Sequence, residues 1–400
     1  MRAVVFDAFG ADPEVREVPA PEPPPGGAVI RVEATGLCRS DWHGWQGHDP
    51  DIRVFPHVPG HELAGVVEAV GSGVASWRPG DRVTVPFVCA CGSCAACLAG
   101  DHQVCEHQTQ PGFTRWGSFA EYVAVDHADV NLVRLPEEMA FTTAASLGCR
   151  FATSYRAVTA VGRVRPDEWV VVHGCGGVGL SAVMIAAAAG ARVIAVDVSA
   201  GALELARRFG AVACVGAEPS GTEPSGAEPS GAGSFRAEPS GTEPLGAEPS
   251  GTESSRTEPL GAEPSGAGSF RAESSGADVA ARVRELTSGG AHVSIDALGS
   301  PGTCLASIES LRRRGRHVQI GLLPGLTPVP MGRVIGYELE LLGSHGMAAH
   351  AYPAMLEAVA GGALRPDALV TRSIGLDEAG AALASIGSVP GVTMILPSLR

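Results

Sequence analysis

Long apolar runs are missing from this chain of 400 residues. Its longest runs, such as residues 180–189 (LSAVMIAAAA), fall far short of the roughly 20 residues that a membrane-spanning helix requires. The first ten residues (MRAVVFDAFG) also lack the apolar core and the small-residue cleavage site of a secretion signal. We therefore expect no membrane contact and a cytoplasmic location.

Clustered basic residues are scarce as well. The 29 Lys and Arg are outnumbered by 43 Asp and Glu, which gives a formal net charge of −14. Proteins that bind nucleic acid rely on clustered positive charge, so we expect no nucleic-acid partner. The length and the 45% of hydrophobic residues suffice for two domains. In a reducing compartment, ten cysteines indicate metal ligands, catalytic groups or buried apolar residues rather than disulfides.

The sequence shows two different patterns of predicted secondary structure. Short β-rich runs separated by Gly and Pro in the first 150 residues predict an antiparallel, barrel-like domain, with strands at 28–33, 62–70 and 81–88. From about Pro166 the pattern alternates between strand and helix, which predicts a parallel α/β sheet. Its expected elements are strands at 169–173, 192–197, 211–215, 292–297, 317–322 and 339–343, with helices at 180–189, 200–209 and 278–286.

A low-complexity repeat interrupts the second pattern, that of alternating strands and helices, at residues 217–276. It consists of pentapeptides such as AEPSG and TEPLG, with ten Glu against three Arg and almost no apolar residues. Such a segment cannot bury enough surface to offset its ordering entropy, so we predict a disordered surface insertion. It is either an inert insertion, the reading we favour, or a segment that recognises or tethers a partner.

The segment 173–180 (HGCGGVGL) carries a glycine motif between an apolar strand and an apolar helix. Gly174 permits the tight turn, Gly176 lets a pyrophosphate approach the backbone, and Gly179 lets helix and strand pack closely. Asp197 ends the next strand, where its carboxylate can bind ribose hydroxyls and repel a 2′-phosphate. NAD is therefore the predicted coenzyme, although a glycine-rich structural turn beside an unrelated Asp is the plain alternative. The predicted coenzyme-binding residues of this region are Gly174, Gly176, Gly177, Val178, Gly179 and Asp197.

Four closely spaced cysteines predict a structural zinc site. Cys91, Cys94, Cys97 and Cys105 follow a C-x₂-C-x₂-C-x₇-C spacing in a Gly- and Ala-rich loop. Four thiolates close the coordination of a tetrahedral ion and leave no place for a substrate. Cys89 is a competing ligand, but the even spacing favours Cys91. A zinc ribbon for nucleic acid is the rival reading, which the lack of basic neighbours disfavours.

A looser set of residues can form a catalytic zinc site. Cys38 and His61 with Cys149 would supply two sulfurs and one nitrogen and leave one position open, and Asp41 could orient His61. Taken singly, Cys149 could equally be a buried small residue and His61 a hydrogen-bonded core histidine. The spacing alone leaves both readings open.

These motifs together resemble the zinc-containing alcohol dehydrogenases of the medium-chain dehydrogenase/reductase superfamily. GLCRSDWH is similar to the family's catalytic cysteine segment and PGHELAGVVEAVGSGV to its G-H-E motif. CGSCAACLAGDHQVC is similar to its structural-zinc lobe and HGCGGVG to its coenzyme fingerprint. The order of the motifs is also the family's order. The repeat at 217–276 has no counterpart in the family pattern.

The resemblance implies a fold and a division of the chain. A GroES-like antiparallel β-barrel catalytic domain would occupy residues 1–150 and resume at 346–400. A Rossmann doubly wound parallel sheet that binds NAD would occupy residues 151–345, interrupted by the disordered repeat. The family's members also imply a homodimer or homotetramer.

The same resemblance assigns roles to single residues. Cys38, His61 and Cys149 become catalytic zinc ligands, and Glu62 a nearby carboxylate that can approach the metal. Ser40 becomes the hydroxyl that accepts the substrate proton and His43 the end of its relay to solvent. Thr153 becomes the residue that packs against the nicotinamide.

The predicted activity is oxidoreduction between an alcohol and an aldehyde or ketone, with NAD and two zinc ions per chain, one catalytic and one structural. Zinc lowers the pKa of an alcohol oxygen in its open position, so that a zinc-bound alkoxide forms and gives its hydride to NAD. A zinc-free quinone or enone reductase is an alternative, but it would lack Cys38, His61 and the four-cysteine lobe. A non-catalytic protein that binds zinc and NAD, and uses the repeat to engage partners, is another.

Overall fold

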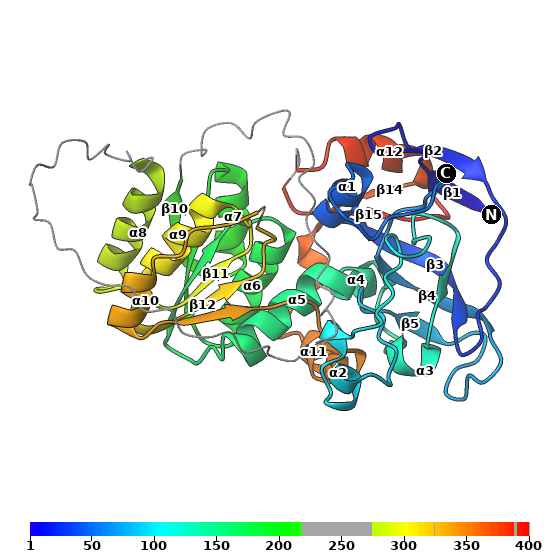
Figure 1. Ribbon diagram of the computed structural model, residues 1–400, viewed down its shortest axis with the longest axis horizontal. Helices are drawn as coiled ribbons and strands as arrows, with labels where there is room; N and C mark the ends of the chain where they lie inside the picture. Colours follow the sequence, from blue (N-terminus) through cyan, green and yellow to red (C-terminus); the bar gives the residue numbers. More distant parts are fainter. Residues whose placement is uncertain (218–273, 324, 388–389, 400) are drawn as a thin grey trace, which may run out of the picture.

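The computed structural model describes the chain except for residues 218–273, 324, 388–389 and 400, and it places the described parts in two lobes (Figure 1). The predicted disordered insertion therefore lies outside the described residues, apart from its two ends. At one end, the backbone N–H of Ala217 donates to the carbonyl of Asp197 at 3.0 Å, so Ala217 belongs to the sheet edge. At the other end, helix α8 (Ser274–Leu286) begins four residues earlier than the predicted start at Asp278.

One lobe contains a parallel sheet of six strands within the described residues. Its strand order is β10-β9-β8-β11-β12-β13, in which every neighbouring pair is parallel. This is the 3-2-1-4-5-6 order of a doubly wound dinucleotide-binding fold, as predicted. The strands are β8 (Trp169–His173), β9 (Arg192–Asp197), β10 (Ala211–Gly216), β11 (Ala291–Asp296), β12 (Leu311–Gln319) and β13 (Glu340–Gly343).

Helices connect these strands and cover them. Helix α6 carries apolar residues around its whole circumference, because it is buried along its length. Helices α7 and α9 each begin directly after a serine that caps them. The Ser199 hydroxyl accepts from the N–H of Ala202 in α7, and the Ser300 hydroxyl accepts from the N–H of Thr303 in α9. The helices besides α8 are α6 (Gly177–Ala188), α7 (Ala200–Arg208), α9 (Pro301–Glu309) and α10 (Met331–Tyr337).

Two predicted boundaries in this lobe were wrong. The helix expected at 180–189 begins at Gly177, because the glycine segment forms its first turn as well as the preceding loop. The strand expected at 317–322 runs instead from Leu311 to Gln319. Its first half (LRRRGR) hid the strand from a search for apolar runs, because Arg312, Arg313 and Arg314 are exposed at its beginning.

The other lobe is built on a mainly antiparallel sheet of seven strands within the described residues. Its order is β14-β15-β3-β4-β5-β7, with β6 paired to β3. Strands β14 and β15 come from the end of the chain, and β15 pairs with β3 through Thr393 opposite Leu37. The last part of the chain therefore returns to the first sheet, while the exact domain boundaries stay a prediction. The strands are β3 (Ala28–Leu37), β4 (Glu62–Val70), β5 (Arg82–Thr84), β6 (Tyr122–Val125), β7 (Val133–Arg134), β14 (Val370–Ile374) and β15 (Val392–Ile395).

Short elements complete this lobe. Strands β1 (Arg2–Val5) and β2 (Glu14–Glu17) form a separate antiparallel pair. The helices are α1 (Arg39–Trp45), α2 (Ala95–Leu98), α3 (Ala128–Asn131), α4 (Phe141–Ala145), α11 (Tyr352–Ala360) and α12 (Leu376–Ala384). Single turns lie at η1 (His102–Val104), η4 (Ala349–Ala351) and η5 (Pro366–Leu369). No helix in the described part of the chain is long and apolar enough to cross a membrane, and the cytoplasmic location stays a prediction.

A continuous helical segment joins the two lobes. It runs from α4 through the π-helical turn η2 (Leu147–Phe151) and α5 (Ala152–Arg156) to a second π-helical turn, η3 (Ala157–Val161). Tyr352 of α11 is fully buried against this segment, and its hydroxyl donates to the carbonyl of Gly148 at 3.2 Å. One apolar core extends from the barrel residues Ala34 and Ala64 to the sheet strands β8 and β9. The joint is therefore a packed core, and π-helical turns of this kind are frequent at functional sites.

Candidate functional site

The joint brings together the four residues predicted to form the catalytic metal centre. One ligand atom from each of Cys38, His61, Glu62 and Cys149 lies within 4.8 Å of the others. Cys38 immediately precedes α1, His61 and Glu62 stand at the start of β4, and Cys149 lies in η2. Cys38, His61 and Glu62 are buried, whereas Cys149 is half-buried. Three distant segments thus converge on one point.

The orientation of His61 is fixed by Asp41. The Nδ1 of His61 lies 2.8 Å from Oδ1 of Asp41, which also accepts from the backbone N–H of Gly60 at 3.1 Å. The Oδ2 of the same carboxylate accepts from the N–H of Cys38 at 2.9 Å. With Nδ1 engaged, the other nitrogen, Nε2, is buried and has no hydrogen-bond partner among the described residues.

An unpartnered buried nitrogen beside two thiols fits zinc. Buried polar atoms normally have partners, and a metal ion would provide one for Nε2. The neighbouring thiol of Cys149 holds the pKa of the Cys38 thiol well below its usual value, which favours the thiolate that binds metals. Burial opposes the charged form of His61, but Asp41 and Cys38 outweigh it and raise the pKa of His61. A bound dication would reverse that last effect, since it binds the neutral imidazole.

Both oxygens of the Glu62 carboxylate are occupied by one arginine. Oε1 of Glu62 accepts from the backbone N–H and from Nε of Arg150, each at 3.0 Å, and Oε2 pairs with Nη2. Burial raises the pKa of Glu62 to about 7, against the lowering effect of Arg150. Arg150 was missed by the sequence analysis, although its place directly after Cys149 in the chain could have drawn attention to it.

Aromatic rings and helix α1 surround the centre. The ring centroids of Phe113 and Phe87 lie 5.3 Å and 6.1 Å from that of His61. Ser40 and His43 lie three residues apart on α1, so they share one side of it, and the Ser40 hydroxyl is 3.8 Å from Sγ of Cys38. Nδ1 of His43 lies 3.1 Å from Nδ1 of His48, an exposed residue.

The four cysteines of the second predicted centre also come together. Their sulfurs lie within 4.8 Å of one another, with Cys91 and Cys97 at 3.9 Å and Cys94 and Cys105 at 3.8 Å. Four sulfurs at about 2.3 Å from a central ion stand about 3.8 Å apart, so the spacing fits a tetrahedral zinc and is far too long for disulfides. Cys89 lies outside the cluster, in the barrel core.

Hydrogen bonds to the sulfurs support thiolates in this cluster. Sγ of Cys91 accepts from the N–H groups of Ser93 and Cys94 at 3.4 Å each. The bonds from Ser93 lower the pKa of Cys91 to about 5. Sγ of Cys105 accepts from the N–H of His107 at 3.3 Å. The loop therefore provides four sulfurs and lowers the pKa of Cys91 and Cys94, whereas burial raises the pKa of Cys97 and Cys105.

The glycine motif forms the turn between β8 and α6. Gly174 has a φ of +84°, which favours glycine, and a Cβ at Gly179 would collide with the carbonyl oxygen of Gly174. A Cβ at Gly176 would meet nothing within 4 Å, so the backbone there is open to a ligand. Gly177 and Val178 form the first turn of α6, whose N–H groups point towards that opening.

The two remaining predicted coenzyme residues flank this turn. Asp197 ends β9, where its Oδ2 accepts from the N–H of Cys175 at 2.6 Å and its Oδ1 from that of Ser199 at 2.7 Å. Asp197 thus has a structural role beside any role in binding ribose. Thr153 is buried in α5, four residues after Cys149.

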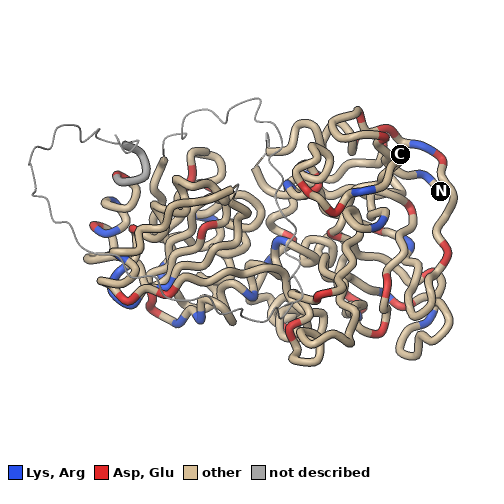
Figure 2. The backbone as a smooth tube through the Cα atoms, in the orientation of Figure 1, with Lys and Arg blue, Asp and Glu red and all other residues tan. Residues whose placement is uncertain are grey.

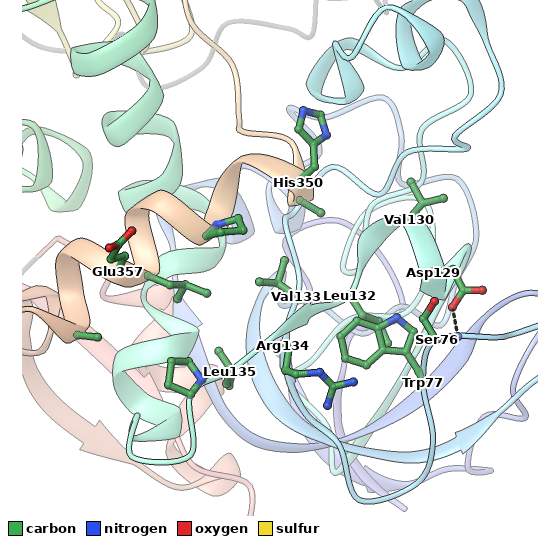
Figure 3. A pocket seen from close by; sticks show the side chains of 15 residues that line it. Ser76, Trp77, Asp129, Val130, Leu132, Val133, Arg134, Leu135, His350 and Glu357 are labelled. Carbon is green, nitrogen blue, oxygen red and sulfur yellow. Dashed lines mark hydrogen bonds between the residues drawn. The ribbon is translucent and has the colours of Figure 1, made fainter.

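Two aromatic residues that are near the candidate zinc ligands in the sequence, Trp45 and Phe87, lie in different surroundings in the structure. Phe87 contacts His61, as described above, whereas Trp45 is buried in another core and its Nε1 donates to the carbonyl of Ala11 at 2.6 Å. A groove of about 740 Å³ lies elsewhere, between α11 and β7, and is lined by Trp77, Val133 and Leu356 among others (Figure 3). None of the predicted site residues lines it.

Comparisons with known proteins agree with this arrangement. Residues 24–137 match the alcohol dehydrogenase GroES-like domain and residues 243–361 match the zinc-binding dehydrogenase family. An alcohol dehydrogenase of Geobacillus stearothermophilus is 39% identical over 214 residues, which cover 53% of this chain and 62% of that protein. The aligned region thus spans less than two thirds of this relative.

Solved structures resemble the whole chain. An alcohol dehydrogenase from Thermus sp. ATN1 has a TM-score of 0.77 at 28% identity, and the likeness covers 100% of both chains. A structure described as an NAD-dependent alcohol dehydrogenase has a TM-score of 0.75 at 27% identity and 99% coverage of both.

Fold and site together define a two-domain, metal-binding dehydrogenase with a GroES-like domain and a Rossmann domain. The two matching domain families and the relatives indicate the family more closely. The chain carries the alcohol dehydrogenase GroES-like and zinc-binding dehydrogenase domain families and resembles the zinc-type alcohol dehydrogenases of the medium-chain dehydrogenase/reductase superfamily.

The four-cysteine lobe can be tested with a matched pair of variants. We expect Cys97→Ser to remove about one zinc ion per chain, because three sulfurs cannot close the tetrahedral site. Cys89→Ser, which alters a buried thiol outside the cluster, should keep the full zinc content. Metal analysis of the purified chains checks both, and equal zinc in the Cys97 variant and the unaltered chain would contradict the site.

Proposed function

We propose that this chain transfers a hydride between an alcohol and NAD and produces an aldehyde or ketone in the oxidative direction. The observation that carries the proposal is the buried, unpartnered Nε2 of His61, grouped with the thiols of Cys38 and Cys149. The glycine turn is adjacent, because Arg150 follows Cys149 and its Cδ would lie 2.5 Å from a Cβ at Gly177. The proposed metal site and the proposed coenzyme site are thus adjacent in the fold.

The metal would be held by Cys38, His61 and Cys149. When bound, zinc supplies a Lewis acid with one open position, which lowers the pKa of an alcohol and polarises a carbonyl. Asp41 holds the His61 ring so that Nε2 faces the thiols, and a carboxylate in this place also makes the imidazole a better ligand. A second zinc ion in the four-cysteine lobe would be structural.

The coenzyme would lie on the glycine turn. The open backbone at Gly176 and the N–H groups at the start of α6 suit a pyrophosphate. Asp197 stands at the end of β9, where its negative charge disfavours the 2′-phosphate of NADP. Thr153 belongs to the segment that joins the two centres and would pack against the nicotinamide. These residues favour NAD.

Side chains of α1 would remove the proton of the alcohol. Ser40, whose hydroxyl is 3.8 Å from Sγ of Cys38, would accept the proton that the alcohol loses. His43 lies on the same side of the helix and would pass the proton outwards, since an imidazole ring can accept a proton on one nitrogen and donate one from the other. His48 lies 3.1 Å from His43 and is exposed, so it offers an exit to water.

A panel of substrates tests the activity. We expect the zinc-replete chain to reduce NAD, and NADP more slowly, with at least one of a set of primary, secondary, aromatic and polyhydric alcohols. Cys38→Ser should abolish turnover because it removes a ligand of the catalytic metal, whereas Cys304→Ser, a buried thiol in α9, should keep it. NADH absorbance measures both. No turnover on any alcohol, despite bound zinc and NAD, would refute the proposal.

The proton relay is tested by His43→Gln. We expect kcat to fall about 10- to 100-fold, because general acid–base groups contribute on that order or more. Added imidazole should restore part of the rate, and His48→Gln should have a smaller effect because water can replace it. Zinc content and NAD affinity, measured in the same samples, should stay unchanged. An unaltered kcat in His43→Gln would remove this histidine from the relay.

We also propose that the chain forms a homodimer or a larger homo-oligomer through the β13 edge of the parallel sheet. Among the described residues, β13 pairs only with β12, so its outer edge is open. The segment between β12 and β13 exposes large apolar side chains, with Leu322 at 78% and Ile335 of α10 at 73% of full exposure. Exposed apolar clusters next to an open strand edge favour association.

Light scattering in solution tests the assembly. We expect the unaltered chain to have two or four times the monomer mass of 40.7 kDa. The double variant Leu322→Glu/Ile335→Glu should shift it towards the monomer, because it places charge in the apolar contact. Val212→Glu alters an exposed residue of β10, the opposite edge, and should leave the mass unchanged. A monomeric unaltered chain would exclude the proposal.

A further inference from the structure

Arg150 is buried at the joint and makes four hydrogen bonds to two residues, Glu62 and Leu37. Its backbone N–H and Nε donate to Oε1 of Glu62, Nη2 pairs with Oε2, and Nη1 donates to the carbonyl of Leu37 at 2.9 Å. The residue is 7% exposed, and Glu62 is fully buried. A buried arginine with all of its contacts on two neighbours is a fixed part of the structure rather than a surface charge.

The partners of Arg150 follow a pattern along the chain. Leu37 directly precedes Cys38, and Glu62 directly follows His61. Arg150 itself directly follows Cys149. Each of the three candidate zinc ligands is thus a chain neighbour of one member of this Arg150 network, and the network links the same three segments that the metal would link.

Glycines make room for the pair. A Cβ at Gly36 would collide with Oε2 of Glu62 and lie 2.7 Å from Nη2 of Arg150, although the backbone of Gly36 has no positive φ that would itself require glycine. On the other side, a Cβ at Gly177 would lie 2.5 Å from Cδ of Arg150. The space between β3 and the start of α6 is therefore shaped to the arginine.

We propose that Arg150 is a positioning residue that holds the three ligand-bearing segments together and keeps the Glu62 carboxylate away from the metal. The proposal rests on the function proposed above, because it needs zinc at Cys38, His61 and Cys149. It assigns to Glu62 the role of an anchor for Arg150 while both of its oxygens are engaged. Loss of the guanidinium would leave Glu62 buried without a partner and free to compete for the metal.

The experiment measures zinc retention, independently of turnover. Purified Arg150→Met, Arg150→Lys and the unaltered chain are challenged with a chelator, and zinc release is followed by a metal-sensitive dye. We expect Arg150→Met to release the catalytic zinc about 10- to 100-fold faster, as is typical when a group that orients metal ligands is removed. Arg150→Lys should fall between, because it keeps the charge without the two-pronged contact.

A matched control separates this effect from the loss of any buried arginine. Arg316 lies in the second half of β12, is 9% exposed and pairs with Glu168. Figure 2 shows that basic and acidic residues occur in both lobes. Arg316→Met should lower the thermal stability but keep the slow zinc release of the unaltered chain. Equal release rates in Arg150→Met and the unaltered chain would overturn the proposal, as would equally fast release in Arg316→Met.

A second variant decides the matter if Arg150→Met does not fold. Gly36→Ala keeps both members of the pair but pushes a methyl group between them, so it should also speed zinc release. Gly336→Ala, where a Cβ meets nothing within 4 Å, is its control. Unchanged release in a folded Gly36→Ala would overturn the proposal.

Failure of the proposed function would look different. In that case Cys38→Ser and the unaltered chain would contain the same amount of zinc, because no metal would occupy the first centre. Failure of the positioning role alone would leave that difference in zinc content intact while the release rates stayed equal.

Discussion

The carboxylate of Asp41 is the contact on which the rest of the metal centre depends. Its two oxygens accept from the N–H groups of Cys38 and Gly60 and from the ring of His61. It therefore fixes the beginning of α1, the turn before β4 and the ring of His61 at once. Because one ring nitrogen is committed to Asp41, the other is directed at the two thiols, and this makes the site a place for a metal.

The apolar core around this contact packs the two lobes together, so that the metal centre and the glycine turn lie close to each other. Cys149 and Arg150 lie on the π-helical turn of the joining segment, with the barrel sheet on one side and the start of α6 on the other. A group bound at the glycine turn and a group bound at Cys38 would consequently be neighbours. The arrangement suits a hydride transfer, which requires two reactants at close distance.

Much of this could be predicted from the sequence, because spacing reports on local geometry. The glycines between β8 and α6 and the four cysteines of the lobe each act within a few residues, and their positions agree with the motifs. Arg150 could not be predicted, since its role comes from partners in β3 and β4 that are distant in the chain. The same limit applies to Trp45, whose place in the core depends on Ala11. The contact of His48 with His43 depends instead on the turn that follows α1. The early part of β12 was missed for a different reason, because three exposed arginines precede the stretch of the strand that is buried.

The place where the repeat leaves and rejoins the chain has a practical consequence. Ala217 continues β10 and residue 274 begins α8, and β10 is the edge strand opposite β13 in the sheet. The last described residue before the repeat therefore lies at the edge of the sheet opposite β13, the strand of the proposed subunit contact. The same position would serve as an attachment point inside the chain for a fluorescent domain or a surface tether.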